Sequence, residues 1–404
     1  MKNRNTLIFS LTFIAFVLFI YHIGNFPDFY FDETHYLKAA LDWIQLTPTT
    51  NLEHPPLGKL IIASGIKLYG QNPFGFRMMN VFSGTLIITF TFLIAEILFI
   101  DLLWASFVTI FSLLNFWIYI NSRIAMLDIF LVQFYIMAIY FYLAFDKSRI
   151  KRYFWLSSFF WGIAVAIKWS GVFLYFPFIS YLIIHTIYKK EYKKLKWLIG
   201  FGIFSICIYF LTFSPYMFTK GGYKYNFYEI VFKLPFTMLE LQSSVPAEHP
   251  YASSWFSWVF MLRPIWYEFK QFPITQTFRG VILLGNPVQM FIGFVSVVML
   301  TLRINRINHI TRMLLLTFLF SWMIWGVLPR KVYFFYYFFP MAMLYSFLFP
   351  MFLKEFFSEK EGRNIFIIVL ILSLYMFWYF FPVISGDLTP EAVRLKWYWF
   401  KTWI

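Results

Sequence analysis

The chain has 404 residues, of which 60% are hydrophobic, 25% aromatic and only 13% charged. A water-soluble domain carries about 25% charged residues, so this composition excludes an ordinary soluble fold. In a soluble protein the net charge of +15 would favour nucleic acid as a partner. In so apolar a chain, lysines and arginines mark cytosolic loops and contacts with membrane lipid instead, and no nucleic-acid partner is expected. The single cysteine, Cys207, excludes a disulfide framework within one chain.

Apolar runs close to the thickness of a bilayer core recur along the whole chain and predict an all-α integral membrane protein. The first run ends without a small-residue cleavage site and is predicted to be a retained helix. We predict about eleven transmembrane helices, over residues 6–24, 76–100, 102–120, 124–145, 154–167, 172–188, 197–213, 280–302, 313–327, 332–353 and 365–384.

The short basic connections between these runs determine the predicted orientation. With the N-terminus in the cytosol, alternate connections place every basic cluster on the cytosolic side, as the positive-inside rule requires. These clusters lie within residues 147–152, 189–196, 303–312 and 354–363. The C-terminus then lies outside, and the protein is predicted to be a multi-pass protein of the plasma (inner) membrane.

Two long segments, both rich in Trp, Tyr, Pro and His, fall on the outer side. They divide the chain into three predicted regions. An N-terminal transmembrane catalytic region spans residues 1–214 and includes the first outer loop, 25–75. The second outer loop spans residues 215–279, and a four-helix transmembrane region spans residues 280–404.

A short amphipathic helix is predicted within the first outer loop. Apolar side chains recur there at helical spacing, opposite polar ones, at Tyr36, Ala39, Ala40, Trp43 and Ile44. Such a helix is expected to lie in the plane of the membrane interface.

Motifs of soluble nucleotide-dependent enzymes are absent from the sequence. There is no glycine-rich loop ending in GK[ST], no GxGxxG, no HExxH and no DxD. ATP-driven transport and nucleotide-sugar chemistry lose support accordingly. No metal site or cofactor is predicted, although the residues do not rule out a divalent cation.

Two adjacent acids, Asp32 and Glu33, follow the first predicted span on its outer side. Charges so near the hydrocarbon boundary are costly and usually functional. A carboxylate in this place can deprotonate a hydroxyl nucleophile. The alternative, with about equal weight from position alone, is a solvated pair in a loop.

The outer side also collects basic and polar groups from distant segments. His54 and Lys59 flank two prolines before a predicted helix start, which an ordinary loop-to-helix junction would also explain. Arg123 precedes Asp128 near the outer end of a span, and such an arginine either binds a lipid phosphate or extends to the headgroups. The remaining candidates are His249, Arg263 and Arg330. Together these groups supply the fixed positive charge that a phosphate leaving group needs.

At these positions the sequence resembles the protein O-mannosyltransferase family, within the membrane glycosyltransferases that use polyprenyl-phosphate sugars. The resembling motifs occur in the order of the family and span most of the chain. They are FDETHY at 31–36, HPPLGK at 54–59, SRIAMLD at 122–128, HPYASSW at 249–255, MLRP at 261–264 and LLGNP at 283–287.

The resemblance implies that Asp32 is the catalytic base on a Ser or Thr hydroxyl and that Glu33 positions substrate. The converse assignment, with Glu33 as the base and Asp32 holding the loop, is the alternative. The resemblance also implies a polyprenyl-phosphate mannose donor, inversion at the anomeric carbon and Arg123 as a donor-phosphate contact. Help is expected from Arg263, Arg330 or His249. His54, Lys59 and Asp128 are predicted to bind substrate or position the loops.

Three functions follow from these observations. The first is transfer of a sugar, mannose by resemblance, to hydroxyls of exported proteins on the outer face. The second keeps the donor chemistry but uses a lipid or cell-surface glycan as acceptor. The third is a transporter or flippase, which should show related halves or broken helices at mid-membrane. The odd number of predicted helices and the ionisable groups gathered outside disfavour it.

Overall fold

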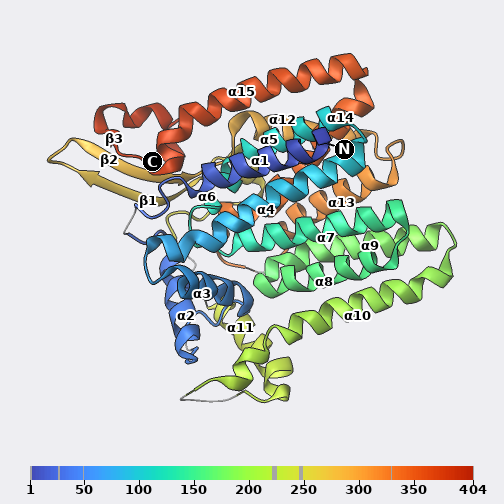
Figure 1. Ribbon diagram of the computed structural model, residues 1–404, viewed down its shortest axis with the longest axis horizontal. Helices are drawn as coiled ribbons and strands as arrows, with labels where there is room; N and C mark the ends of the chain where they lie inside the picture. Colours follow the sequence, from blue (N-terminus) through green and yellow to red (C-terminus); the bar gives the residue numbers. More distant parts are fainter. Residues whose placement is uncertain are drawn as a thin grey trace.

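The computed structural model describes residues 2–25, 28–48, 50–220, 225–244, 249–328 and 330–403. The predicted outer loops also contain residues 26, 27, 49, 221–224 and 245–248, which lie outside the described part. The described chain is mostly helical (Figure 1). Its long helices lie side by side, and a small sheet with several short helices lies at one end of the bundle.

Each predicted apolar run overlaps a helix. The longer helices are α1 (Lys2–Ile20), α4 (Pro73–Phe99), α5 (Leu102–Leu113), α7 (Asp128–Ser148), α8 (Lys151–Ile167), α9 (Val172–Tyr188), α10 (Leu195–Leu211), α12 (Pro287–Leu302), α13 (His309–Met323), α14 (Phe339–Phe356) and α15 (Glu359–Ser385). Among the described residues, seven helical segments are long and apolar enough to cross a membrane: Asn3–Ile20, Pro73–Phe99, Asp128–Ser148, Trp169–Tyr188, Tyr192–Phe218, Phe335–Phe356 and Glu359–Ser385. The protein is therefore a multi-pass membrane protein.

Shorter helices connect the long ones, and most lie at the end of the bundle that carries the sheet (Figure 1). They are α2 (Glu33–Gln45), α3 (Leu57–Tyr69), α6 (Phe116–Asn121) and α11 (Leu234–Ser243). Helix α2 is the predicted amphipathic helix, and this prediction is confirmed. It buries the predicted stripe of Tyr36, Ala39, Ala40 and Trp43 and leaves Lys38 exposed.

A three-stranded antiparallel sheet corrects the all-α prediction. Strand β1 (Ile265–Phe272) pairs with β2 (Thr277–Leu283), which pairs with β3 (Thr389–Pro390) near the C-terminus. The helix predicted to begin at residue 280 therefore begins at Pro287 instead. An apolar run shows no period that separates a buried strand from the helix after it. The signal for the true start was Asn286, whose side chain accepts from the Val288 amide, followed by proline at the first helical position.

Two other predicted helices have different bounds in the structure. The single helix predicted over residues 102–120 is divided between α5 and α6, because Asn115 accepts a hydrogen bond from the Trp117 amide, 2.9 Å away, and starts a new helix. Helix α7 begins at Asp128 instead of residue 124. An acid in the first turn of a helix interacts favourably with the helix dipole.

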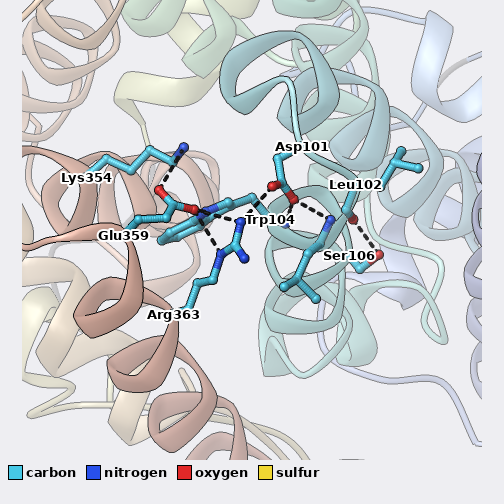
Figure 2. A network of polar contacts seen from close by, with 8 residues as sticks. Asp101, Leu102, Trp104, Ser106, Lys354, Glu359 and Arg363 are labelled. Atoms are coloured by element: carbon cyan, nitrogen blue, oxygen red, sulfur yellow. Dashed lines mark hydrogen bonds and ion pairs between the residues drawn. The ribbon is translucent and has the colours of Figure 1, made fainter.

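The end of the bundle opposite the sheet is held by charges at helix termini (Figure 2). Asp101 caps α5 through the amides of Leu103 and Trp104 and also pairs with Arg363 of α15 at 2.8 Å. Glu359 accepts from Arg363 at 2.9 Å and from the Trp104 indole at 2.5 Å. These contacts fix the start of α15 against the start of α5.

Candidate active site

The centre of the sheet end is a buried ion pair between Glu33, the first residue of α2, and Arg77 in α4. Both side chains are fully buried, and Arg77 Nε and Nη2 each lie 2.8 Å from a different oxygen of Glu33. The amides of Tyr30 and Ala125 also donate to this carboxylate, at 3.0 and 2.9 Å. Arg77 further donates to the backbone oxygen of Ile23 at 3.0 Å. The pair therefore joins the acid loop to α4, to the end of α1 and to the loop before α7.

The sequence did not indicate that Glu33 is bound to an arginine and two backbone amides. Each of its carboxylate oxygens accepts two hydrogen bonds from protein donors. A carboxylate so fully satisfied has little capacity left for a substrate hydroxyl. The alternative use of Glu33 as the base does not fit this arrangement, whereas its predicted role in positioning substrate stays a prediction.

Asp32 differs from its neighbour because its carboxylate is not committed to a cation. It stands at the position before α2, yet its side chain caps no backbone amide of the helix. The Tyr36 hydroxyl donates to its Oδ2 at 3.3 Å. Burial raises the pKa of Asp32, the nearby Asp128 raises it further, and the charge of Lys168 opposes the rise. Asp32 thus presents a basic oxygen close to a fixed cation.

A second buried ion pair, between Lys168 and Asp128, lies beside Asp32. The ammonium of Lys168 donates to both oxygens of Asp128, at 3.0 and 2.9 Å, and both side chains are almost fully buried. Lys168 follows the last residue of α8, and Asp128 is the first residue of α7. The same ammonium lies 4.6 Å from the centre of the Tyr336 ring. These contacts hold the Lys168 ammonium between the end of α8 and the start of α7.

Arg330 supplies a second cation to this region. Its Nε donates to the backbone oxygen of Val332 at 3.0 Å, and its guanidinium lies 5.1 Å from the centre of the Tyr337 ring. Lys168 Nζ lies 5.4 Å from the centre of the same ring. The two cations therefore lie against one aromatic side chain. Paired cations held in this way suit an anionic phosphate.

His54 lies in the loop before α3, near the charges of Lys168 and Arg330, and Lys59 lies in the first turn of α3. The Lys59 ammonium is buried and donates to the backbone oxygens of Asn51 and His54, at 2.5 and 2.7 Å, so it holds the loop in place. Burial lowers the pKa of Lys59 to about 7. Burial also lowers the pKa of His54 well below its usual range, and the charge of Lys168 lowers it further. Among the described residues, His54 Nδ1 is buried without a hydrogen-bond partner. Such a nitrogen is a candidate contact for a ligand.

An aromatic cluster around Phe31 holds the residue that precedes Asp32. Phe31 has a backbone φ of 44°, in the left-handed region that costs energy for a residue with a side chain. Its ring lies within 5.4–6.3 Å, centre to centre, of five rings from three other segments: His249, Tyr251, Tyr267, Phe334 and Tyr336. These contacts compensate the strained backbone and bring His249 to the acid loop.

Two of the predicted phosphate ligands, Arg123 and Arg263, bind backbone oxygens in the structure. The Arg123 guanidinium is buried, donates to the backbone oxygens of Tyr21 and Ser385, and lies 4.9 Å from the centre of the Tyr119 ring. Arg263 donates to the backbone oxygens of Pro250 and Thr402, and so ties the C-terminal segment to the second outer loop. The structure gives both arginines backbone partners, and their contacts with the donor phosphate stay predictions.

The structure thus brings together four predicted site residues: Asp32, His54, Asp128 and Arg330. The His249 ring packs against Phe31, next to Asp32 in the sequence. Among the described residues, no group of three or more His, Cys, Asp or Glu side chains could hold a metal ion. The arrangement offers a carboxylate that pairs with no cation, the Lys168 ammonium close to it, and Arg330 against the same Tyr337 ring as Lys168. It can remove a proton from a hydroxyl on one side and stabilise an anionic leaving group on the other.

Three family models match consecutive parts of this chain. Two described as dolichyl-phosphate-mannose-protein mannosyltransferase match residues 9–74 and 53–213. The third, described as the C-terminal four TMM region of protein-O-mannosyltransferase, matches residues 227–403. The chain belongs to the protein O-mannosyltransferase family. The resemblance that the acid pair and the HPPLGK motif indicated is confirmed.

Two bacterial relatives within this family are similar to the chain. The polyprenol-phosphate-mannose–protein mannosyltransferase of Mycolicibacterium smegmatis is 25% identical over 332 residues, which cover 65% of this chain and 64% of the relative. The chain thus matches slightly less than two thirds of that protein's length. The Mycobacterium tuberculosis protein with the same description is 21% identical over 402 residues, covering 81% of this chain and 76% of the relative.

Solved structures show the same fold. The S. cerevisiae protein O-mannosyltransferase Pmt1-Pmt2 complex bound to the sugar donor matches with a TM-score of 0.83 and 13% identity, over 100% of this chain and 93% of that one. ArnT from Cupriavidus metallidurans bound to undecaprenyl phosphate matches with a TM-score of 0.59 and 12% identity, over 91% and 62% of the two chains. At these identities the likeness concerns the fold.

Two cations of the site, Lys168 and Arg77, are not among the residues that the sequence predicts to be functional. Lys168 falls between the predicted helices at 154–167 and 172–188, and Arg77 falls at the start of the predicted helix at 76–100. Both carried a signal, because a single ionisable residue within a long apolar stretch usually has a buried partner. The sequence did not indicate which acid each cation would pair with.

The Glu33–Arg77 pair yields a prediction about stability. Glu33→Gln removes the carboxylate charge that pairs directly with the buried Arg77 guanidinium, so we expect a loss of about 3–5 kcal/mol in the free energy of unfolding. Thermal unfolding of purified protein in detergent measures this loss. The matched control is Glu96→Gln, which removes a partly exposed pair with Arg4 and should cost at most about 1 kcal/mol. Equal losses in the two variants would contradict the role given to Glu33.

Proposed function

We propose that this protein transfers mannose from a polyprenyl-phosphate carrier to Ser or Thr hydroxyls of exported proteins. The proposal rests on family membership and on relatives described as polyprenol-phosphate-mannose–protein mannosyltransferases. The observation that carries it is the Asp32 carboxylate, which pairs with no cation and lies close to the charge of Lys168, with Arg330 against the same Tyr337 ring as Lys168. No metal or cofactor is included in the proposal.

The proposed reaction is a single displacement at the anomeric carbon. Asp32 takes the proton from the acceptor hydroxyl as its oxygen bonds to that carbon. The bond from the carbon to the phosphate oxygen breaks, and the phosphate leaves as an anion without needing an acid. Lys168 and Arg330 stabilise the charge that develops on it. Attack opposite the leaving group inverts the configuration of the sugar.

We further propose eleven membrane spans, with the N-terminus in the cytosol and the site on the outer face of the plasma membrane. The arrangement in Figure 1 supports this topology. The start of α4 and the ends of α1 and α15 lie at the end that carries α2, α3 and the sheet, as alternating spans require. The basic connections at residues 147–152 and 189–196 lie at the opposite end, on the side that the positive-inside rule assigns to the cytosol.

Asp32→Asn tests the base. The amide keeps the shape of the side chain but accepts no proton, so we expect turnover to fall by about 10²-fold or more with donor binding retained. Transfer of labelled mannose from polyprenyl-phosphate mannose to a Ser/Thr-rich peptide, in detergent and without any gradient, measures this. Asp42→Asn is the matched control, because Asp42 lies near the other end of α2 and accepts from the Thr50 hydroxyl. Near-normal transfer by Asp32→Asn would refute the assignment.

Lys168→Gln tests the leaving-group site. Loss of a fixed charge that stabilises the departing phosphate should lower turnover by about 10²-fold. The same transfer assay measures the loss, and Lys168→Arg should retain part of the activity because it keeps the charge. Lys270→Gln is the control, since Lys270 is a partly exposed cation that pairs with Asp28 at 3.1 Å. A normal rate for Lys168→Gln would exclude Lys168 from the site.

The pH dependence follows from the environment of Asp32. Burial raises its pKa above 3.8, and the base works only when ionised, so transfer should fall as the pH drops through this raised value. Lys168 opposes the rise, so the acid limb of kcat/KM should move to higher pH in Lys168→Gln. Profiles of the wild type and the residual activity of the variant measure both effects. If the acid limb of kcat/KM lies at the same pH in Lys168→Gln as in the wild type, the two residues are not coupled.

A further inference from the structure

A cavity lies at the end of the bundle opposite the candidate active site. It has a volume of about 710 Å³ and lies where five helices begin or end: α7, α8, α9, α10 and α13. Figure 1 shows these helix ends on the side away from the sheet. The volume falls within the roughly 300–1,000 Å³ typical of small-molecule sites. Nothing in the proposed transfer reaction uses this cavity.

The cavity rim is cationic, and part of that charge has no counter-ion. Of the four Lys and Arg side chains that line it, Arg149 pairs with Asp146 at 3.0 Å and Lys194 with Glu191 at 2.6 Å. Within the described residues, the ammonium groups of Lys151 and Lys189 form no ion pair. Lys151 lies 5.0 Å from the centre of the Trp197 ring. Two cations therefore remain to balance an external anion.

The wall below the rim is apolar and aromatic. Its apolar lining side chains come from four of the same helices: Tyr142, Phe145, Phe154, Trp155, Leu182 and Leu198. A free anion would gain nothing from these groups. An amphiphile with an anionic headgroup and a hydrocarbon tail would bury its tail against them while its headgroup meets the two lysines.

The position of the rim along the helices matches the depth of a lipid headgroup. The apolar segments Asp128–Ser148 and Trp169–Tyr188 end at this level, and the segment Tyr192–Phe218 begins there. Trp and Lys side chains at such boundaries interact with headgroups. We propose that this cavity binds an anionic glycerophospholipid, with its phosphate between Lys151 and Lys189. This site is separate from the proposed transfer and does not depend on it.

Native mass spectrometry of the full-length protein in detergent tests this proposal. The protein is mixed with phosphatidylglycerol or phosphatidylcholine of the same acyl chains. We expect phosphatidylglycerol to be retained in preference to phosphatidylcholine. We expect the double variant Lys151→Gln/Lys189→Gln to lose this retention by about tenfold, because each lysine near an anionic lipid surface contributes severalfold in affinity.

The matched control is Lys190→Gln/Lys193→Gln, which removes the same charge from exposed neighbours outside the cavity lining. This control should retain phosphatidylglycerol as the wild type does. An equal loss in the two double variants would overturn the proposal in favour of a diffuse surface charge. Equal retention of the two lipids would also overturn it. Displacement of the lipid by millimolar inorganic phosphate would identify an ion site instead and would overturn the lipid assignment.

Discussion

The buried ion pair between Glu33 and Arg77 is the contact on which the position of the acid loop depends. Taking two charges out of water costs several kcal/mol for each, and only good geometry with further hydrogen bonds offsets that cost. Here each carboxylate oxygen receives one arginine N–H and one backbone amide. The amides belong to Tyr30 and Ala125, so one side chain fixes the chain before α2 and the loop before α7 together. Asp32 is held by this frame, because it adjoins Glu33.

Two neighbouring acids thus have different environments. Asp32 and Glu33 are adjacent at the start of α2, and successive side chains on a helix point about 100° apart. One carboxylate enters the ion pair, while the other lies beside Lys168, with burial raising its pKa. Of these two acids, Glu33 is fully paired and holds the loop, whereas Asp32 pairs with no cation and is the one that can react.

The sequence predicted the helices better than the site. Long apolar runs locate the helices because length and hydropathy are enough to identify a membrane span. The prediction is wrong at residues 280–283, which belong to β2, because this apolar strand leads into α12 without a change of hydrophobic period. Motifs predicted the segments that meet around Asp32. They did not predict side-chain direction: Arg123 lies close in sequence to Ala125, which contacts Glu33, yet its guanidinium turns to the carbonyls of Tyr21 and Ser385. Long-range partners of this kind depend on tertiary packing.

The pairing of the three predicted acids agrees with the proposed chemistry. Hydrolysis of a glycosidic bond uses two carboxyl groups, because the leaving alcohol must be protonated. Here Glu33 is committed to Arg77 and Asp128 to Lys168, so Asp32 alone is free to exchange a proton. A phosphate leaves without a proton and instead needs positive charge, which Arg330 carries and to which the Lys168 ammonium, although paired with Asp128, adds a charged donor. One free carboxylate with two fixed cations therefore suits displacement of a phosphate by an alcohol, and it offers no second carboxyl among these three acids to protonate the leaving group of a glycoside.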